Sequence, residues 1–348
     1  MKVRVGVIGL GAQGKVHLSK YANLSDQAEI VAVSDVIASM AEQMAKKFGA
    51  KVWYTDYKEL IKRTDIDAVS ICVPNSLHAD VAVASAEAGK HILLEKPMAV
   101  SLDDADKILR AVEKNDVKLM LGYNQVFNPM VQRVKKDVAD GRLGRVSIIK
   151  SQYVRNLTAT SRESFGWRAD VSQAGGGVIT ESGVHRLSLS WYLGGEVKEV
   201  SCFTERLEMD IDAEDNAAIL LKYENGGIGV VICSWVAEFK GPEWEKIEVY
   251  GSKGSRIGYG DSRSGVAYLE LSDIGMPEYG RIHSYFPPQA IFKGGFDTFN
   301  DEFKHFLDCI QRDQKPIVDG HAGKAILEIT LAAYESAKHK RAVDLPLS

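Results

Sequence analysis

The sequence predicts an α/β protein: an N-terminal doubly wound parallel sheet of Rossmann type, followed by an α+β domain on a large, open, mostly antiparallel sheet. Three observations predict this fold class. Apolar strand-like runs alternate with helical segments over the first third of the chain, a glycine-rich turn follows the first run, and hairpin-like turns separate alternating segments further on. Because 348 residues are long for one core, we expect two domains, at 1–122 and 123–348.

The composition is that of an ordinary globular protein, with 45% hydrophobic and 26% charged residues. The net charge is −4 and there is no long basic run, which argues against nucleic acid and anionic membranes as partners. Lys2 and Arg4 interrupt the first apolar run, so it does not resemble a signal peptide, and no apolar stretch approaches membrane-spanning length. The four cysteines stand singly without metal-ligand spacing. We therefore expect reduced thiols, no metal site and a cytoplasmic protein.

The first strand, 3–8, leads directly into the pattern Gly9-x-Gly11-x-x-Gly14. Gly9 permits a tight strand-to-helix turn, Gly11 lets a pyrophosphate approach the backbone, and Gly14 lets the helix pack close to the strand. The helix N-terminus adds free N–H groups and a positive dipole end. An ordinary glycine-rich turn is the alternative interpretation of this motif. The predicted dinucleotide site also includes Leu10, Ala12 and Gln13.

A second apolar run, 30–34, ends at Asp35, which lies 21 residues beyond Gly14. A carboxylate at this place accepts hydrogen bonds from both ribose hydroxyls of NAD and repels the additional phosphate of NADP. Val36 is not the arginine that NADP would favour. We therefore predict NAD as cofactor and NADP as less suitable, with a solvated loop aspartate as the alternative for Asp35.

The alternation of helices and strands continues to Gly122. A proline ends the strand 67–73, and polar residues after it start a helix. Since ligands of doubly wound sheets lie at the carboxyl ends of strands, we predict cofactor contacts from Val73, Pro74, Asn75 and His78. Local packing at the start of the helix is an equal alternative for His78. The further segments expected are strands at 51–54, 91–94 and 118–121 and helices ending near 49, 61, 89 and 115.

The strand 91–94 delivers Glu95, Lys96 and Pro97 at its carboxyl end. A lysine in this place points into the ligand cleft of such a sheet, whereas a surface loop cation is the plainer alternative. Pro97 fixes the bend, for which a cis peptide bond is one solution.

The second domain opens with Asn128 and Pro129, which cap and start a helix that runs to about Asp140. Near Gly177 another helix begins, and on it Glu181 and His185 are four residues apart, so that they share one face. A carboxylate on one imidazole nitrogen leaves the other free for proton transfer, although a surface pair is the simpler interpretation. Strands are expected at 146–155, 196–207, 214–223, 227–236, 245–250, 253–258 and 266–271, and closing helices at 296–312 and 322–340.

Several motifs together resemble the glucose-fructose oxidoreductase, inositol dehydrogenase and MocA (Gfo/Idh/MocA) family over nearly the whole chain. They are the glycine motif, Glu95-Lys96-Pro97, Gly122-Tyr123-Asn124, Trp167-Arg168, and Gly175-Gly176-Gly177 with Gly183-x-His185. The resemblance implies an NAD(P)-dependent enzyme on sugars, cyclitols or related polyols, assembled as a homodimer or homotetramer through the open sheet. It also implies that Lys96 contacts the reacting hydroxyl and that His185 is the acid/base, assisted by residue 181.

We expect the remaining site residues to surround these groups. Cofactor contacts are expected from Glu95, Lys96, Asn124, Trp167 and Arg168, and substrate contacts from Lys96, Asn124, Tyr153, Arg155, Glu181 and His185. The chain departs from the family pattern at three positions, because members usually carry Asp at 181 and 188 and often Arg at 125, where this chain has Glu181, Ser188 and Gln125. Glu181 keeps the charge and reaches one methylene farther, so it serves either His185 or a substrate hydroxyl.

Three functions remain at this point. The first is a polyol or sugar dehydrogenase, which reduces NAD in net terms. The second is an NAD-assisted glycosidase or epimerase, which oxidises its substrate transiently and regenerates its cofactor. The third is a non-enzymatic sensor on the same fold, against which the presence of Lys96 and His185 argues.

Overall fold

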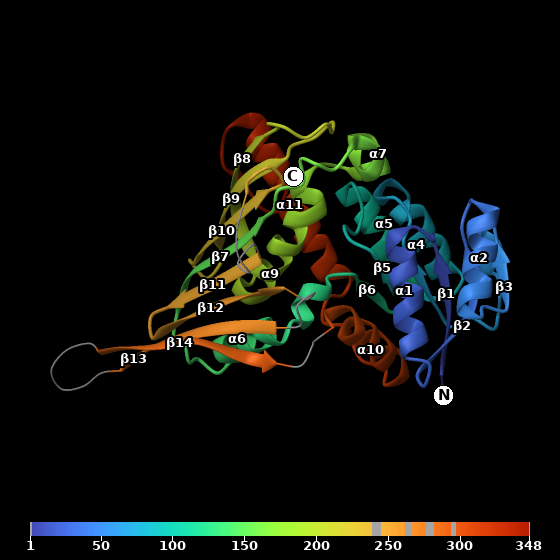
Figure 1. The fold of residues 1–348 in the computed structure, drawn as a ribbon, viewed down its shortest axis with the longest axis horizontal. Helices are drawn as coiled ribbons and strands as arrows, with labels where there is room; N and C mark the ends of the chain where they lie inside the picture. The colour runs from blue at the N-terminus through green and yellow to red at the C-terminus, as the bar shows by residue number, and fades with distance from the viewer. Residues whose placement is uncertain (1, 239–244, 262–265, 276–281, 294–296, 348) are drawn as a thin grey trace. The chain divides into compact units, whose positions relative to one another are not determined.

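The computed structural model describes residues 2–238, 245–261, 266–275, 282–293 and 297–347 (Figure 1). Their contacts divide the chain into two compact units, Met1–Tyr123 with Phe299–Leu327 and Asn124–Thr298 with Glu328–Ser348. The first break falls beside the predicted boundary at 122. The division differs from the predicted domains at residues 299–327, which the sequence placed with the second domain.

The first unit contains a six-stranded parallel sheet in the order β3-β2-β1-β4-β5-β6, which is the doubly wound topology predicted. Its strands are almost wholly buried, since helices cover both faces, and this explains their continuous apolar runs. The strands are β1 (Val3–Ile8), β2 (Ala28–Ser34), β3 (Val52–Tyr54), β4 (Ala68–Ile71), β5 (His91–Leu94) and β6 (Leu119–Leu121).

Helices alternate with these strands, and their ends follow local capping rules. Ser101 accepts a hydrogen bond from the backbone N–H of Asp104 and so caps its helix as predicted, and Gly49 ends another in the left-handed conformation. The helices are α1 (Ala12–Asn23), α2 (Ala38–Phe48), α3 (Tyr57–Ile61), the short η1 (Asn75–Leu77), α4 (His78–Glu87) and α5 (Leu102–Lys114).

The segment Phe299–Leu327 joins the first unit because its aromatic face packs on α1. Phe303 of α10 (Thr298–Gln311) makes edge contacts with the rings of His17 and Tyr21, at centroid distances of 4.7 and 4.8 Å. The N–H of Leu121 also donates to the carbonyl of Val318. The periodic helix predicted from residue 296 is thus present from Thr298, while 296 itself lies outside the described residues.

The second unit is built on an open sheet in the order β14-β13-β12-β11-β7-β10-β9-β8-β15, in the part of the chain described. All of its described pairs are antiparallel except β10 with β7, which confirms the predicted mostly antiparallel sheet. Its strands are β7 (Val146–Val154), β8 (Val197–Glu205), β9 (Asn216–Tyr223), β10 (Ile228–Ser234), β11 (Glu245–Gly251), β12 (Gly254–Asp261), β13 (Val266–Gly275), β14 (Ile282–Lys293) and β15 (Val343–Asp344).

Two features of this sheet differ from the prediction. Strands β14 and β15 were not predicted, and β9 begins at Asn216 rather than at 214. Glu214 and Asp215 precede the strand because their carboxylates accept backbone N–H groups of neighbouring segments instead of standing in the ladder. The predicted turn at 224–227 is confirmed, with Gly226 at a φ of 84° between β9 and β10.

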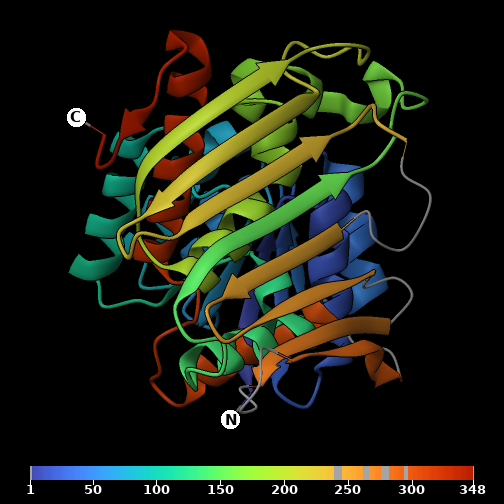
Figure 2. The ribbon, with the colours of Figure 1, turned by 90° about the vertical axis from the view of Figure 1, so that its left-hand side faces the viewer.

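In the part of the chain that the structure describes, four helical elements pack against one face of the second sheet (Figure 2): α6 (Pro129–Ala139), the π-helical turn η4 (Ile179–Gly183), α9 (Val184–Gly194) and the C-terminal part of α11 (Gly320–His339). The other helices described in this unit are η2 (Asn124–Phe127), α7 (Arg162–Phe165), η3 (Gly166–Ala169) and α8 (Val171–Ala174). Among the described residues, no helix combines the length and the apolar character needed to cross a bilayer.

The other face of this sheet carries no helix in the view of Figure 2. Large apolar side chains of four neighbouring strands are exposed on it, from 40 to 78% of their surface. The strand register places them side by side, since Ile148 pairs with Ile228, Leu220 with Val230 and Phe203 with Ala218. The exposed residues are Ile148, Phe203, Leu220, Ile228 and Ile232.

Candidate functional site

The glycine turn of the first unit has one open position between two crowded ones. A Cβ on Gly9 would overlap the carbonyl of Cys72 in the next strand, and one on Gly14 would overlap the carbonyl of Gly9. Gly9 also has a φ of 86°. A Cβ on Gly11 would meet nothing within 4 Å. Gly9 and Gly14 therefore serve the fold, whereas Gly11 faces open space.

The N-terminus of α1 fits the phosphates of a dinucleotide. Gly11 is its N-cap, no side chain caps it, and its first turn contains no acidic residue. Its N–H groups and positive dipole end are thus available to an anion. Ala12 begins this helix and is exposed beside Gly11. The turn has the form that NAD requires.

Asp35 is tied directly to this turn. Its Oδ2 accepts the backbone N–H of Leu10 at 2.8 Å, and its Oδ1 accepts that of Ile37 at 2.9 Å. These bonds fix the carboxylate at the carboxyl end of β2, where the ribose of a dinucleotide is expected. Leu10, which the predicted cofactor site includes, has a fully buried side chain, and its N–H binds Asp35.

The turn after β4 corrects the interpretation of His78. Its ring is fully buried, with Nδ1 2.7 Å from the carbonyl of Pro97 and Nε2 3.1 Å from that of Val73. Burial lowers the pKa of His78, although both carbonyls oppose this shift. The side chain therefore joins two backbone segments and does not reach a ligand. Asn75 is also buried, while Val73 and Pro74 remain partly exposed at the strand end.

Glu95 connects α1 to the carboxyl end of β5. Its Oε1 lies 3.0 Å from Nε2 of His17 and accepts Nε2–H of Gln13 at 3.3 Å, while Oε2 accepts the N–H of Lys96 at 3.2 Å. Burial alone would raise the pKa of Glu95, but His17 and Lys96 bring it below the usual range. Gln13 and Glu95 thus hold each other and position Lys96. The side chain of Lys96 is partly exposed, and its bond to Pro97 is cis, as the sequence suggested.

In the second unit, Glu181 lies in the π-helical turn η4, and His185 lies in α9 directly after it. Single π-turns within helices occur often at functional sites. Both side chains are partly exposed. Ser188, one turn later, is buried and donates to the carbonyl of His185. The serine in place of the family's usual aspartate is therefore used inside its own helix.

Glu181 has an ion-pair partner that the sequence did not indicate. Its Oε2 accepts Nε–H of Arg168 at 3.0 Å, and the Arg168 guanidinium lies over the Trp167 ring, 4.4 Å from its centroid. The sequence named Arg168 and Trp167 only as ligand contacts. The structure adds that they form one cluster with the carboxylate expected to assist His185.

The sheet contributes Tyr153 to the same neighbourhood. Tyr153 of β7 pairs in register with Cys233 of β10, and the Cys233 sulfur lies close to Gly183 at the end of η4. Trp235, two residues after Cys233, donates Nε1–H to the hydroxyl of Ser182 at 3.0 Å. Tyr153 therefore stands beside the turn that carries Glu181. Arg155 follows on the same face of the sheet and is partly exposed.

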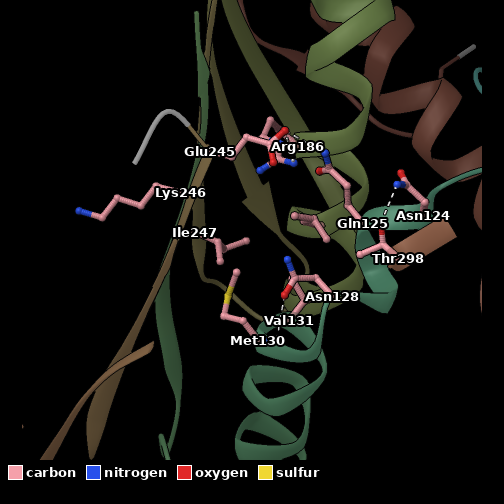
Figure 3. Close-up of a pocket in the computed structure, with 11 residues that line it drawn as sticks. Asn124, Gln125, Asn128, Met130, Val131, Arg186, Glu245, Lys246, Ile247 and Thr298 are labelled. Atoms are coloured by element: carbon pink, nitrogen blue, oxygen red, sulfur yellow. Dashed lines mark hydrogen bonds and ion pairs between the residues drawn. The ribbon is translucent and has the colours of Figure 1, made fainter. Parts of the chain in front are cut away.

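Asn124 is buried in the second unit and does not extend freely into a site. Its Nδ2–H donates to the hydroxyl of Thr298 at 2.9 Å (Figure 3). It lines a narrow cavity of about 40 Å³ together with Gln125, Arg186 and Glu245, among others. This is enough for a few ordered water molecules.

Gln125 and Arg186 share a carboxylate at this cavity. Gln125 donates Nε2–H to Oε1 of Glu245 at 3.1 Å, and a terminal nitrogen of the buried Arg186 lies 3.8 Å from the same oxygen (Figure 3). Arg186 and Glu245 were not among the predicted site residues. The available signal was Arg186 itself, a charged residue directly after His185 on a helix whose other buried residues are uncharged.

The four cysteines are unpaired thiols, three of them buried and Cys72 partly so, which confirms the single thiols expected. In the described ranges, no three His, Cys, Asp or Glu side chains are grouped as a metal site would require.

Two family models match the chain. Residues 3–123 match the model described as "Oxidoreductase family, NAD-binding Rossmann fold", and residues 131–257 match "GFO/IDH/MocA C-terminal domain". Together they cover more than half of the sequence. The chain belongs to the GFO/IDH/MocA oxidoreductase family. Its first unit is therefore an NAD-binding Rossmann domain, and the resemblance inferred from the motifs is confirmed.

Similar proteins of this oxidoreductase family cover the full chain. A myo-inositol 2-dehydrogenase of Thermotoga maritima is 30% identical over 99% of this chain and 98% of its own. A levoglucosan dehydrogenase of Pseudarthrobacter phenanthrenivorans is 28% identical over 99% and 98%. A solved levoglucosan dehydrogenase in complex with NADH has a TM-score of 0.90, 25% identity and full coverage of both chains. The predicted enzyme class, an oxidoreductase that uses NAD, is thus confirmed.

Proposed function

We propose that this protein is an NAD-dependent dehydrogenase that oxidises one hydroxyl group of a sugar, a cyclitol or a related polyol. The similar inositol and levoglucosan dehydrogenases, which span nearly the whole chain, support this substrate class. Glu95 is the observation that carries the proposal. It binds Gln13 and His17 of the helix that starts at the glycine turn, and it also binds the backbone of Lys96. The backbone of Lys96 is thereby held beside the nucleotide-binding turn.

Lys96 and His185 have separate roles in this proposal. When bound, NAD supplies the acceptor for the hydride that leaves the substrate carbon. His185 takes the proton of the reacting hydroxyl as general base. The ammonium of Lys96 stabilises the negative charge that develops on the substrate oxygen. Glu181 assists His185, and the ion pair with Arg168 holds the Glu181 carboxylate in place.

The glycine turn, Asp35, Val73 and Pro74 would hold NAD, and Trp167 and Arg168 are further expected cofactor contacts. Tyr153 and Arg155 would bind further substrate hydroxyls, since a polyol needs several polar partners. Asn124 would act by positioning, because its amide already binds Thr298.

We also propose that the protein forms a homodimer or homotetramer through the open sheet. We infer that a second copy of this chain buries the exposed apolar row of the sheet, because such a surface favours subunit contact. The row consists of Ile148, Phe203, Leu220, Ile228 and Ile232. A two-fold axis would place the same row on both sides of the contact. The segments 239–244 and 262–265 of the predicted interface, 196–271, lie outside the described residues.

The test is a screen of cyclitols, aldoses and anhydrosugars with NAD, followed at the absorbance of NADH. We expect stoichiometric NADH with at least one polyol. Tight NAD binding with substrate turnover but no NADH would favour an NAD-assisted glycosidase or epimerase. NAD binding without any turnover would favour a sensor.

His185→Ala tests the assignment of the base. It should lower kcat by about 10²- to 10⁴-fold while the Kd of NAD stays unchanged, because the base acts only on the hydroxyl. His339→Ala is the matched control, since His339 is exposed on α11 and pairs with Glu335. Normal turnover of His185→Ala would contradict the assigned base.

A further inference from the structure

Glu214 is a partly buried residue just before β9, and it binds the start of the turn that leads to His185. Its carboxylate accepts the N–H of Gly177, with both oxygens 3.1 to 3.2 Å away, and the N–H of Ile179 at 2.9 Å. Its backbone carbonyl accepts the N–H of Val178 at 2.9 Å. One residue thus satisfies three successive N–H groups at the point where η4 begins.

The glycine run before η4 is shaped to receive this residue. A Cβ on Gly177 would overlap the carbonyl of Glu214, and a Cβ on Gly176 would overlap the hydroxyl of Tyr334. The absence of side chains at these two glycines therefore lets the backbone pack against Glu214 and Tyr334.

Tyr334 of α11 extends the contact toward Glu181. Its hydroxyl donates to Oε1 of Glu214 at 2.8 Å and lies 2.8 Å from the hydroxyl of Thr180. Because the tyrosine proton goes to the carboxylate, the threonine donates to the tyrosine oxygen. A chain of two hydrogen bonds therefore runs from Glu214 to Thr180, the residue directly before Glu181.

We propose that Glu214 is a positioning residue for the reaction, which fixes the turn η4 and thereby the directions of Glu181 and His185. The inference rests on the proposed function of His185. Glu214 acts through the backbone of 177–179 and through Tyr334 and Thr180, so it touches no substrate and is not itself catalytic. Single π-turns are rare and occur often at functional sites, and functional side chains keep their directions only when the surrounding residues support them.

The charge state of Glu214 matters for this role. Burial raises the pKa of Glu214, although the N–H groups of Ile179 and Gly177 and the hydroxyl of Tyr334 oppose the shift. The titratable groups that face it in the described residues are Tyr334, Cys202 and Cys233, and burial raises the pKa of all three. When the pH falls, only Glu214 among these four groups gains a proton. The protonated carboxyl group then accepts fewer hydrogen bonds from the N–H groups of the turn.

Glu214→Gln reproduces the protonated form at every pH and is the main test. We expect kcat to fall by about 10- to 100-fold, as small misplacements of catalytic groups do, with little change in KM. In the wild-type protein, protonation of Glu214 should lower kcat on the acid side of the pH profile. This decline should be absent from the Glu214→Gln variant. The Kd of NAD should change far less than kcat, because the glycine turn and Asp35 of the first unit are expected to supply most of its contacts.

Two further variants complete the test. Tyr334→Phe removes only the hydroxyl that donates to Glu214, and it should give a smaller loss of kcat in a stably folded protein. Glu208→Gln changes an exposed carboxylate on the same loop and should leave kcat unchanged. If Glu214→Gln or Tyr334→Phe lowers only the unfolding temperature and keeps the wild-type kcat and pH profile, Glu214 is merely a structural cap. If His185→Ala also keeps normal turnover, the assigned base is wrong and Glu214 has no catalytic group to position; the proposed function itself fails only if the wild-type protein oxidises no polyol with NAD.

Discussion

The Nε atom of Arg168 lies 3.0 Å from Oε2 of Glu181, and the arginine side chain is about one-third exposed while the glutamate is 10% exposed. The family usually has aspartate at position 181, and the additional methylene of glutamate lengthens its reach. The pair joins a residue expected to contact NAD with one expected to assist His185. Glu181 therefore has a partner other than the histidine, which the spacing of 181 and 185 did not reveal.

A double-mutant cycle measures the coupling of this pair. Glu181→Gln and Arg168→Met should each lower kcat/KM, and the double variant should lose less than the product of the two factors, because each single change leaves one charge without its partner. The expected coupling is about 0.5 to 3 kcal/mol. The control is Arg162 with Asp212, an exposed pair at 2.7 Å. Strictly multiplicative losses at 168 and 181 would mean that the two side chains act independently.

Asp35 determines the choice of cofactor in a second prediction. Its carboxylate is fixed by the N–H groups of Leu10 and Ile37, so its charge is held where a 2′-phosphate would lie. Asp35→Ser should lower kcat/KM with NAD and raise the ratio of kcat/KM with NADP to kcat/KM with NAD. Asp56→Ser, at the cap of α3, is a control that should not change this ratio. Equal use of both cofactors by the unmodified protein would contradict the role of Asp35.

Much of this site followed from the sequence because local rules determine it. The glycine turn, Asp35 and Lys96 stand at strand ends, and the alternation of buried strands with helices places those ends on one edge of a parallel sheet. The contacts of His78 and Leu10 were not predictable in this way. Their side chains occupy positions at which either a ligand or the backbone is a possible partner, and only the packing selects between the two.

Glu214 escaped the sequence analysis for a related reason. It directly precedes an alternating strand and was taken into that strand, whereas its partners come from 177–179 and from Tyr334. Contacts between segments so distant in the chain leave no periodic signal. Two adjacent acidic residues before a largely buried strand, Glu214 and Asp215, were the available indication.

The oligomer prediction rests on Leu220, which lies in the exposed apolar row and is 50% exposed. A charge at the centre of a subunit contact is costly to desolvate, so Leu220→Glu should shift the protein to monomers in light scattering at micromolar concentration. Val171→Glu is the control, because Val171 is 44% exposed but lies on α8, away from the sheet face. A wild-type monomer would refute the proposed assembly.

The last prediction concerns Glu302, a fully buried carboxyl group of α10 near Glu95. Among the described residues, neither of its oxygens has a hydrogen-bond partner. Burial, and next to it the negative charge of Glu95, raise the pKa of Glu302 well above its ordinary value. Glu95 itself is held charged by His17 and Lys96, so the two carboxyl groups have opposite preferences, and Glu302 is the one that stays protonated.

The raised pKa has a defined sign for stability. Between the ordinary pKa of glutamate and the raised value, the folded protein holds a proton that the unfolded chain has lost, so the contribution of Glu302 to stability falls as the pH rises. Glu302→Gln cannot ionise and is free of this loss. We expect the free energies of unfolding of the variant and the wild-type protein, measured with denaturant, to be similar near pH 5, or slightly lower for the variant. Between about pH 5 and 8 the variant should become increasingly more stable than the wild-type protein. Glu42→Gln, which changes an exposed carboxylate on α2, should show no such trend. If the difference between Glu302→Gln and wild type stayed constant or reversed over this range, Glu302 would be ionised in the folded protein.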